Sequence, residues 1–228
     1  MKKFVIGDIH GAAKALTQCL QRSSFDYQHD MLICLGDVCD GWPESKQAMD
    51  ELLKIDNLVF VMGNHDQWAL DWALTGTADG TWLKQGGEST IKSYADGIPE
   101  THISLWQRAV NYYLDENRLF VHAGIEPEAP LEAQGPNTFL WDRNLYRTAM
   151  ARRLNGNQAN ITVFDEVYIG HTPIHKYSLE PIHSCEIWMM DTGAGWEGVL
   201  TIMDIESKEC FKSDVVESMY PIGSGRVK

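Results

Sequence analysis

Three short apolar runs in the first part of the chain have the length and composition of buried strands. They cover residues 4–6, 31–35 and 58–62. Apolar side chains between the runs recur at helical spacing, as at Ala13, Leu16 and Leu20, and a second helix is expected to begin near Pro43. This alternation of strands and helices predicts a parallel sheet with helices packed against it.

The rest of the chain has a less regular pattern. Helices are expected over residues 101–115 and 139–154, while the glycine-rich segment 80–87 is typical of a loop. Later apolar runs predict strands at residues 119–121, 167–169, 187–190 and 199–205. No repeat or linker divides the chain, so we expect one domain over residues 1–228. Its tail is expected to be flexible from about residue 213, where proline and glycine recur.

Composition and charge limit the classes of partner. With 19 basic and 32 acidic residues the formal net charge is −13, which disfavours nucleic acid or an anionic membrane as the main partner. The five cysteines form no CxxC pair, which is typical of a protein in a reducing compartment. The first apolar run ends at Gly7, too early for a signal peptide or a membrane span. We therefore expect a cytoplasmic protein, and the pattern predicts no particular oligomeric state.

Five of the expected strands end in a turn that contains glycine and side chains able to bind a metal ion. The candidate ligands are Asp8, His10, Asp37, Asn64, His122 and His171. The carboxyl ends of strands in an open α/β sheet meet at one crevice, so these side chains are expected to converge. A single Asp or Asn after a strand commonly caps the next helix. Five strands that end alike are not explained by capping, because capping needs no histidine.

The chemistry of these donors narrows the choice of metal. Carboxylates, an amide oxygen and imidazoles without a thiolate suit Mn²⁺, Fe or Zn²⁺. Six ligands are too many for one tetrahedral ion, but one carboxylate that bridges two ions ~3.5–4 Å apart accommodates them all. We expect two divalent metal ions, manganese first among them.

The motifs GDIHG, GDVCDG, GNHD, HAG and GHT occur in this order between Gly7 and Thr172. They resemble the phosphoprotein phosphatase family of calcineurin-like metallophosphoesterases, in particular its bacterial and bacteriophage serine/threonine phosphatases. Symmetrical dinucleoside tetraphosphatases are a similarly close branch. The resemblance implies an α/β (α+β) fold in which two mixed β-sheets are sandwiched between helices.

The resemblance also implies a role for each motif residue. Asp8 and His10 would bind the first metal, Asp37 would bridge the pair, and Asn64, His122 and His171 would bind the second. Asn64 would also contact the substrate phosphate. A hydroxide that bridges the metals would attack phosphorus, and His65, paired with Asp40, would be the general acid for the leaving oxygen.

Two positions depart from the family pattern or extend it. The related motif usually carries a phosphate-binding arginine where this chain has Gly41, and Lys46, one helical turn further on, is a candidate substitute. Arg143 in the sequence LWDR resembles a phosphate-contacting arginine of related phosphatases, although an arginine on a surface helix has the same appearance. Asp191 also follows an expected strand, and we interpret it as a turn residue.

Three functions remain open from the sequence. The first is a protein phosphatase that acts on a phosphorylated protein or a small phosphoester. The second is a symmetrical dinucleoside tetraphosphatase, for which tryptophans such as Trp42, Trp68, Trp72 and Trp82 would stack bases, although tryptophan is more often a core residue. The third is a catalytically impaired metal-binding module, which only Gly41 favours. Specificity is expected to depend on residues 75–100.

Overall fold

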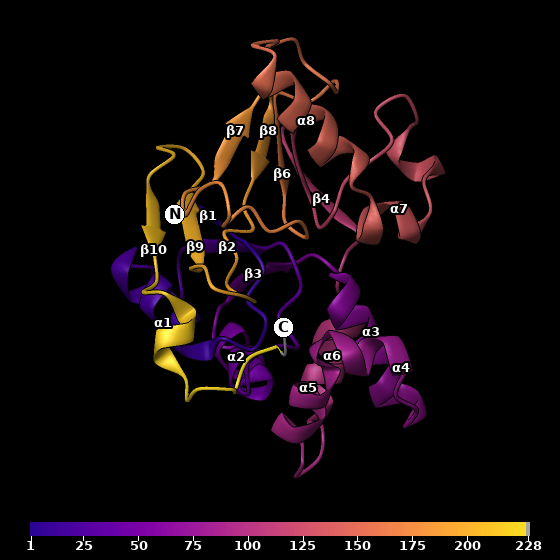
Figure 1. Ribbon diagram of the computed structural model, residues 1–228, viewed down its shortest axis with the longest axis vertical. Helices are drawn as coiled ribbons and strands as arrows, with labels where there is room; N and C mark the ends of the chain where they lie inside the picture. The colour runs from indigo at the N-terminus through magenta and orange to yellow at the C-terminus, as the bar shows by residue number, and fades with distance from the viewer. Residues whose placement is uncertain (227–228) are drawn as a thin grey trace.

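The computed structural model describes residues 1–226, and its centre consists of two mixed β-sheets (Figure 1). The first sheet has the strand order β10-β9-β1-β2-β3. Its strands are β1 (Lys3–Ile6), β2 (Met31–Cys34), β3 (Asn57–Phe60), β9 (Thr201–Asp204) and β10 (Cys210–Lys212). Strands β1, β2 and β3 are parallel, as the sequence predicts, whereas β9 pairs antiparallel with β1 and β10 with β9.

The second sheet has the order β4-β5-β6-β8-β7. Its strands are β4 (Tyr112–Asp115), β5 (Arg118–Val121), β6 (Glu166–Ile169), β7 (Ile182–Ser184) and β8 (Ile187–Met189). Strands β5, β6 and β8 are parallel, and an antiparallel strand lies at each edge.

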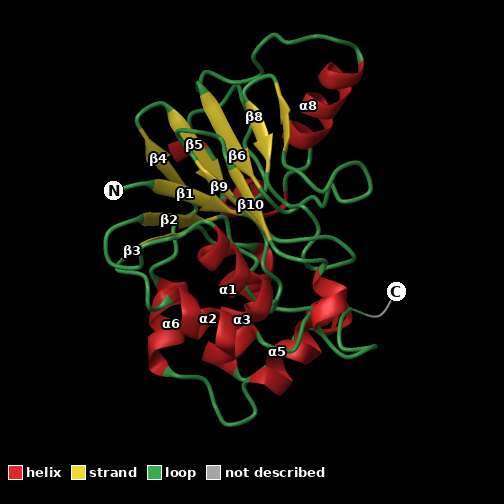
Figure 2. Ribbon diagram, turned by 90° about the vertical axis from the view of Figure 1, so that its left-hand side faces the viewer, coloured by secondary structure: helices red, strands yellow, loops and turns green. Residues whose placement is uncertain are grey.

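The helices cover the outer faces of the two sheets. They are α1 (Ala13–Arg22), α2 (Ser45–Leu52), α3 (Asn64–Thr75), α4 (Gly80–Trp82), α5 (Glu88–Ser93), α6 (Glu100–Gln107), α7 (Pro136–Trp141) and α8 (Asn144–Leu154). Figure 2 shows the strands grouped together, with α1, α2, α3, α5 and α6 at one end and α8 at the other. The predicted fold of two mixed sheets between helices is confirmed.

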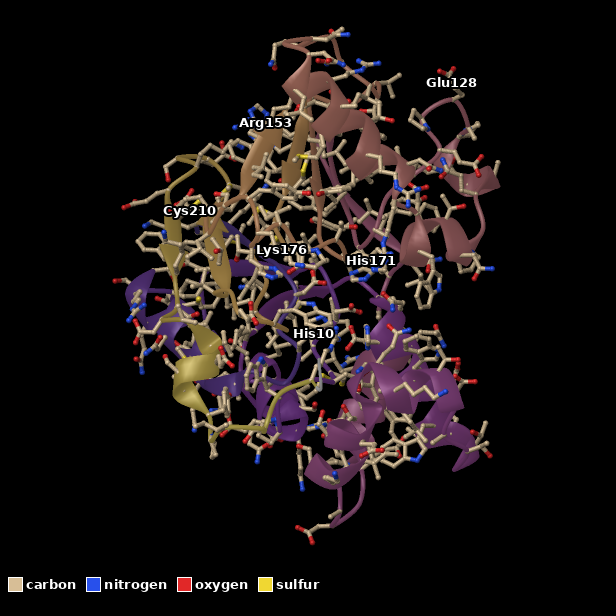
Figure 3. The ribbon with its side chains drawn as sticks, viewed as in Figure 1. His10, Glu128, Arg153, His171, Lys176 and Cys210 are labelled. Carbon is tan, nitrogen blue, oxygen red and sulfur yellow. The ribbon has the colours of Figure 1, made fainter. Side chains whose placement is uncertain are left out.

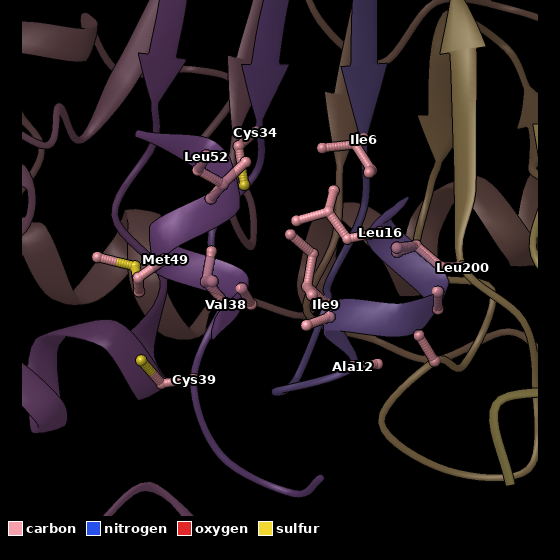
Figure 4. Close-up of a cluster of buried hydrophobic side chains, with 14 of the residues drawn as sticks. Ile6, Ile9, Ala12, Leu16, Cys34, Val38, Cys39, Met49, Leu52 and Leu200 are labelled. Atoms are coloured by element: carbon pink, nitrogen blue, oxygen red, sulfur yellow. The ribbon is translucent and has the colours of Figure 1, made fainter. Parts of the chain in front are cut away.

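Alternation along each strand produces this layered core. Val5 of β1 points into an apolar cluster between the sheets, where it joins Phe120 and Tyr168 of the second sheet. Its neighbours Phe4 and Ile6 belong to the cluster under the helices. Figure 4 shows part of that cluster, in which Ile6 and Cys34 lie near Leu16 and Leu52. The sheets therefore pack face to face and fix the positions of their strand ends.

The prediction of a single helix over residues 101–115 is wrong. Only its first half is helical, as α6, and the second half is the edge strand β4. Asp115 pairs with Arg118 across a two-residue turn at Glu116-Asn117, in which Glu116 has φ +57°. This hairpin half-buries Tyr112 and Tyr113 against the apolar clusters on the two faces of the second sheet, and the pairing with β5 outweighs the helical spacing of the apolar residues.

The predicted helix over residues 139–154 is two helices that meet at Asp142. The Asp142 carboxylate accepts hydrogen bonds from the backbone N–H groups of Asn144 and Leu145, both at 3.0 Å, and so begins α8. Residues 80–87, predicted as a loop, form α4 and a π-helical turn at Leu83–Gly87. Strands β7 and β10 were not predicted, because their sequences, Ile-His-Ser and Cys-Phe-Lys, contain no apolar run.

The tail includes a 3₁₀ turn at Val216–Met219, and Val216 and Tyr220 are buried. The predicted flexibility of this tail and the domain boundary stay predictions. Across residues 1–226, no helix combines the length and apolar character needed to cross a membrane.

Candidate metal centre and active site

All six predicted ligands follow the carboxyl ends of parallel strands, and both sheets contribute. Asp8 and His10 follow β1, Asp37 follows β2, Asn64 begins α3 after β3, His122 follows β5 and His171 follows β6. All six are buried. Figure 3 shows His10 and His171, which come from different sheets, near each other in the middle of the molecule. The predicted convergence therefore occurs across the line where the two sheets meet.

Asp37 lies between two groups of donor atoms. Its Oδ2 is 3.8 Å from Nε2 of His10 and 4.0 Å from Nε2 of His65, while its Oδ1 is 3.4 Å from Nε2 of His122. Two separate clusters share this carboxylate: His10, Asp37 and His65, and Asp37, His122 and His171. Donors that share one ion at ~2.0–2.2 Å lie within twice that distance of one another, and these separations meet that limit.

Asp8 approaches the first cluster. Its Oδ2 is 3.9 Å from Nε2 of His10, and its carboxylate also accepts hydrogen bonds from the backbone N–H of His171 at 3.0 and 3.1 Å. His65, for which we predict no ligand role, lies in the same cluster as His10. The other ring nitrogen of His65, Nδ1, is nevertheless hydrogen-bonded to Asp40.

Backbone carbonyls fix the imidazoles so that Nε2 faces the cluster. Nδ1–H of His122 donates to the carbonyl of Leu35 at 2.8 Å, and Nδ1 of His10 lies 3.1 Å from the carbonyl of Cys39. In this tautomer Nε2 of His122 carries a lone pair, and it faces Oδ1 of Asn64 at 3.0 Å. Two lone pairs that face each other are stabilised by a shared cation.

His171 provides an independent test of fit. Its Nε2 is buried and has no hydrogen-bond partner among residues 1–226. An unpaired buried nitrogen is costly in the interior, and coordination of a metal ion removes that cost. The donor set therefore fits divalent cations that accept nitrogen and oxygen ligands.

Burial keeps the ligand histidines neutral. Burial lowers the pKa of His10 and of His122, and burial together with His122 lowers the pKa of His171 to about 3. A neutral imidazole is the form that binds a metal ion. The lowered pKa values of His10, His122 and His171 thus favour the form able to bind a metal ion near neutral pH.

The pKa values of Asp37 and Asp8 are shifted in opposite directions, because their neighbours differ. Burial alone would raise the pKa of Asp37, but the surrounding histidines, His122 foremost, outweigh it, and the pKa lies below its usual range. Burial and the charges of Asp191 and Asp37 raise the pKa of Asp8 well above its usual range. Bound cations would reverse that shift, because they favour the ionised carboxylate.

The backbone at the site is strained. Four site residues have backbone angles in the left-handed region, which residues other than glycine rarely adopt. They are His10 (φ +51°), Asp37 (φ +51°), Asp40 (φ +74°) and His171 (φ +64°). The motif glycine Gly170 provides close approach, since a Cβ there would lie 2.2 Å from Oδ1 of Asp8. Strained turns and close backbone contact together set the ligand positions.

A buried hydrogen-bond network positions His65. Its Nδ1 lies 2.5 Å from Oδ2 of the fully buried Asp40, and the same oxygen accepts a bond from Nε1–H of Trp82 at 2.7 Å. Oδ1 of Asp40 accepts a bond from the hydroxyl of Thr90 at 2.6 Å. The hydrogen bond between His65 and Asp40 is thus present in the structure, and His65 also lines the cavity.

Sequence reasoning missed the supporting residues of this network. Trp82 and Thr90 come from the segment expected to form specificity loops, and neither belongs to a motif. Asp66 belongs to the GNHD motif but had no assigned role. Its Oδ1 accepts hydrogen bonds from the N–H groups of Val38 and Cys39 at 3.0 and 3.3 Å, which fixes the turn between Asp37 and Asp40.

A cavity of about 760 Å³ opens over the cluster. Arg143 lines it, next to Trp141, whereas Lys46 is not among the described residues at its wall. Arg226, from the tail, does line the cavity. Sequence reasoning gave Arg226 no role, since it lies in a glycine- and serine-rich stretch without a motif.

Asp191 has two aspects. Its Oδ1 accepts a hydrogen bond from the N–H of Gly193 at 3.0 Å, as expected of a turn residue. It also lines the cavity, and burial raises its pKa to about 7. It follows β8, so a further parallel strand ends at the site.

Comparison with known protein families matches residues 1–193 to the calcineurin-like phosphoesterases. The chain belongs to this family, and the protein is a metallophosphoesterase, a hydrolase of phosphate esters. The predicted family is therefore confirmed, and the roles of individual residues stay predictions.

The curated relatives carry two different names. Serine/threonine-protein phosphatase 1 of Salmonella typhimurium is 29% identical over 208 residues, which cover 89% of this chain and 91% of that protein. The symmetrical bis(5'-nucleosyl)-tetraphosphatase of Pseudomonas fluorescens is 32% identical over 166 residues, which cover 69% of this chain and 56% of that protein. A solved structure assigned provisionally as a diadenosine tetraphosphatase has a TM-score of 0.68 at 18% identity, over 92% of each chain, and this likeness concerns the fold alone.

Proposed function

We propose that the protein is a serine/threonine protein phosphatase that hydrolyses phosphomonoesters with two divalent cations, manganese first among them. The observation that carries the proposal is the position of Asp37, shared by two clusters of buried histidines, beside the His65–Asp40 pair. The likeness to Serine/threonine-protein phosphatase 1, which extends over 91% of that protein, favours a phosphorylated protein as substrate.

The ligands divide between the two ions. Asp8 and His10 would hold the first ion, Asp37 would contact both, and Asn64, His122 and His171 would hold the second. When bound, such ions stabilise charge on phosphoryl oxygens and lower the pKa of an attacking water. The chain's own part is to hold these donors in place before substrate arrives.

The proton step belongs to His65. Asp40 accepts the Nδ1–H bond and so holds the ring with Nε2 toward the cavity, from which Nε2–H would protonate the leaving alkoxide oxygen. Arg143 and Asn64, which both line the cavity, would bind the oxygens of the phosphoryl group. No phosphorylated enzyme is required in this scheme.

A second candidate is a symmetrical dinucleoside tetraphosphatase. Aromatic side chains of the cavity wall favour it, because Trp141, Tyr177 and Trp196 expose 40%, 71% and 37% of their surface and could stack on bases. The tryptophans proposed from the sequence are less suited, since Trp42 and Trp82 are buried. A binding module without catalysis has little support, because the His65–Asp40 pair is intact.

One set of assays separates these functions. Turnover would be measured with manganese-loaded protein on p-nitrophenyl phosphate, a phosphothreonine peptide and diadenosine tetraphosphate. A protein phosphatase hydrolyses the peptide with a higher kcat/KM than the dinucleotide. The reverse order would favour the second candidate, and metal content of two ions per chain without any turnover would favour the binding module.

A further inference from the structure

The side chain of Arg226 enters the active site from the C-terminal tail. Its Nη2 lies 2.9 Å from Nδ1 of His10 and 3.3 Å from Nε2 of His65. Its Cζ lies 5.0 Å from the ring centroid of Trp196, on the cavity wall. A guanidinium group thus lies directly beside the proposed general acid.

The chain leading to Arg226 is anchored on the body of the protein. The ring of Tyr220 stacks on Trp42 at 5.1 Å and 19°, and its hydroxyl donates a hydrogen bond to Glu44 at 2.5 Å. Lys14 also contacts this tyrosine, with its Nζ 4.5 Å from the centroid of the Tyr220 ring. Figure 1 shows the C-terminal segment running past α2 toward the middle of the molecule.

Two glycines border the Arg226 side chain, and a third lies just before it in the chain. A Cβ on Gly41 would lie 3.4 Å from Nε of Arg226, and a Cβ on Gly86 would lie at the same distance. Both glycines have positive φ, +87° and +106°, so other residues are disfavoured there on backbone grounds as well. Gly225 lies against Trp42, where a Cβ would come within 2.8 Å of the ring. Two separate segments, at Gly41 and Gly86, therefore pack against the arginine side chain, while Gly225 lets its own segment lie on Trp42.

The guanidinium has hydrogen-bonding capacity to spare. Its Nε–H is buried without an acceptor among residues 1–226. The site carboxylates, Asp37 foremost, act on the charge of Arg226, but none of them accepts a hydrogen bond from this Nε–H. Its neighbours are two imidazoles, and His10 already directs Nδ1 to the carbonyl of Cys39. A planar fork of donors with an unpaired N–H is suited to an incoming group with several oxygen acceptors.

We propose that Arg226 is a substrate-binding residue that holds the phosphoryl group of the ester. It would place on the tail the phosphate clamp that position 41, a glycine, cannot provide. The ligand is a phosphate monoester or inorganic phosphate, whose oxygens would accept bonds from Nε and the terminal nitrogens of the guanidinium. This inference rests on the proposed phosphoester hydrolysis and assigns a recognition residue to the same site.

The test measures phosphate binding apart from turnover. Titration calorimetry would give the Kd of inorganic phosphate for manganese-loaded wild type, Arg226→Ala, Arg226→Lys and Arg22→Ala, with metal content measured on each sample. Arg22 is a matched control, because it loses the same charge but pairs with Asp214 on the surface, away from the cavity wall. KM and kcat for p-nitrophenyl phosphate would be measured alongside.

We expect Arg226→Ala to raise the Kd for phosphate and the KM for the ester about 10- to 100-fold, the loss typical of a charge-assisted contact. Arg226→Lys keeps the charge but not the fork, so an intermediate loss is expected. Arg22→Ala should match wild type, and all four proteins should hold the same amount of metal.

Two results would overturn the inference. One is an unchanged phosphate Kd in Arg226→Ala. The other is tighter phosphate or metal binding in that variant, which would mean that the guanidinium blocks the site. If wild type hydrolyses no ester but Arg226→Ala still binds phosphate more weakly, the proposed function fails while the role of Arg226 in phosphate binding stands.

Discussion

Nδ1 of His65 and Oδ2 of Asp40 lie 2.5 Å apart in a part of the structure that water does not reach. Trp82 and Thr90 donate further hydrogen bonds to the same carboxylate. The pair therefore has one orientation, and the chemistry proposed for His65 can be tested by changing either the ring or its supports.

Replacing His65 by asparagine should remove the proton donor and leave the metal ligands in place. We expect kcat for an alkyl phosphate to fall about 10²- to 10⁴-fold, the usual value of general acid catalysis. The fall should be smaller for p-nitrophenyl phosphate, whose leaving group needs no proton. Metal content measured by mass spectrometry should match wild type, and equal losses on both substrates would contradict the general-acid role.

Trp82→Phe should weaken the orientation of the pair without touching substrate. The lost hydrogen bond to a carboxylate is expected to cost about 10-fold in kcat, with little change in KM. Trp106→Phe is the matched control, because Trp106 is as deeply buried but its Nε1 has no partner among residues 1–226. If the two variants lose the same fraction of kcat, general loosening of the core explains the effect.

The shared carboxylate predicts a stoichiometry. Asp37→Ala should abolish binding of both ions, whereas His171→Ala should retain about one ion per chain. His183→Ala serves as control, since His183 is exposed and stacks on Trp188 in the second sheet. Metal content after dialysis distinguishes the cases, and one retained ion in Asp37→Ala would show that the carboxylate does not bridge.

The lowered pKa of His171 predicts a pH dependence in metal-free protein. The folded-state pKa is about 3 and the ordinary value is 6.5, so below pH 6.5 the unfolded chain binds a proton that the folded protein does not. This contribution to stability is therefore lost as pH falls from 6.5 toward 3. Between pH 7.5 and pH 5, wild type should lose about 2 kcal/mol relative to His171→Asn. Urea unfolding in the presence of a chelator measures the difference, and parallel pH profiles would contradict it.

The backbone of Gly170 lies so close to the Asp8 carboxylate that a methyl group at position 170 should not fit. Gly170→Ala would push the Asp8 carboxylate away from the first cluster, since the new Cβ would lie 2.2 Å from Oδ1. We expect weaker metal binding and a loss of about 1–3 kcal/mol in unfolding free energy. Gly135→Ala is the control, because within residues 1–226 no heavy atom beyond its chain neighbours lies within 4 Å of its Cβ position. Wild-type metal affinity in Gly170→Ala would count against this packing.

The sequence was sufficient for the features that follow from local pattern. The strands before Asp8, Asp37, Asn64, His122 and His171 are marked by apolar runs followed by turns that contain glycine, and parallel pairing then brings their ends together. Where long-range pairing decides, as at β4, helical spacing was misleading. A short edge strand such as β10 has almost no signal of its own.

The supports of the site could not be predicted for a different reason. Trp82 reaches Asp40 from 42 positions away, and Arg226 reaches His10 from 216 positions away. Neither contact has a spacing rule, because each depends on how separate segments pack. Gly41 indicated that the phosphate-binding arginine of the related motif is absent from this position, and the sequence suggested Lys46 as its substitute.

The left-handed backbone at His10, Asp37, Asp40 and His171 has an evolutionary consequence. Each such residue costs the fold on the order of 1 kcal/mol that glycine would recover. Drift toward greater thermostability would thus favour replacements that erase the reaction, and these four positions are where selection for activity opposes selection for a robust fold.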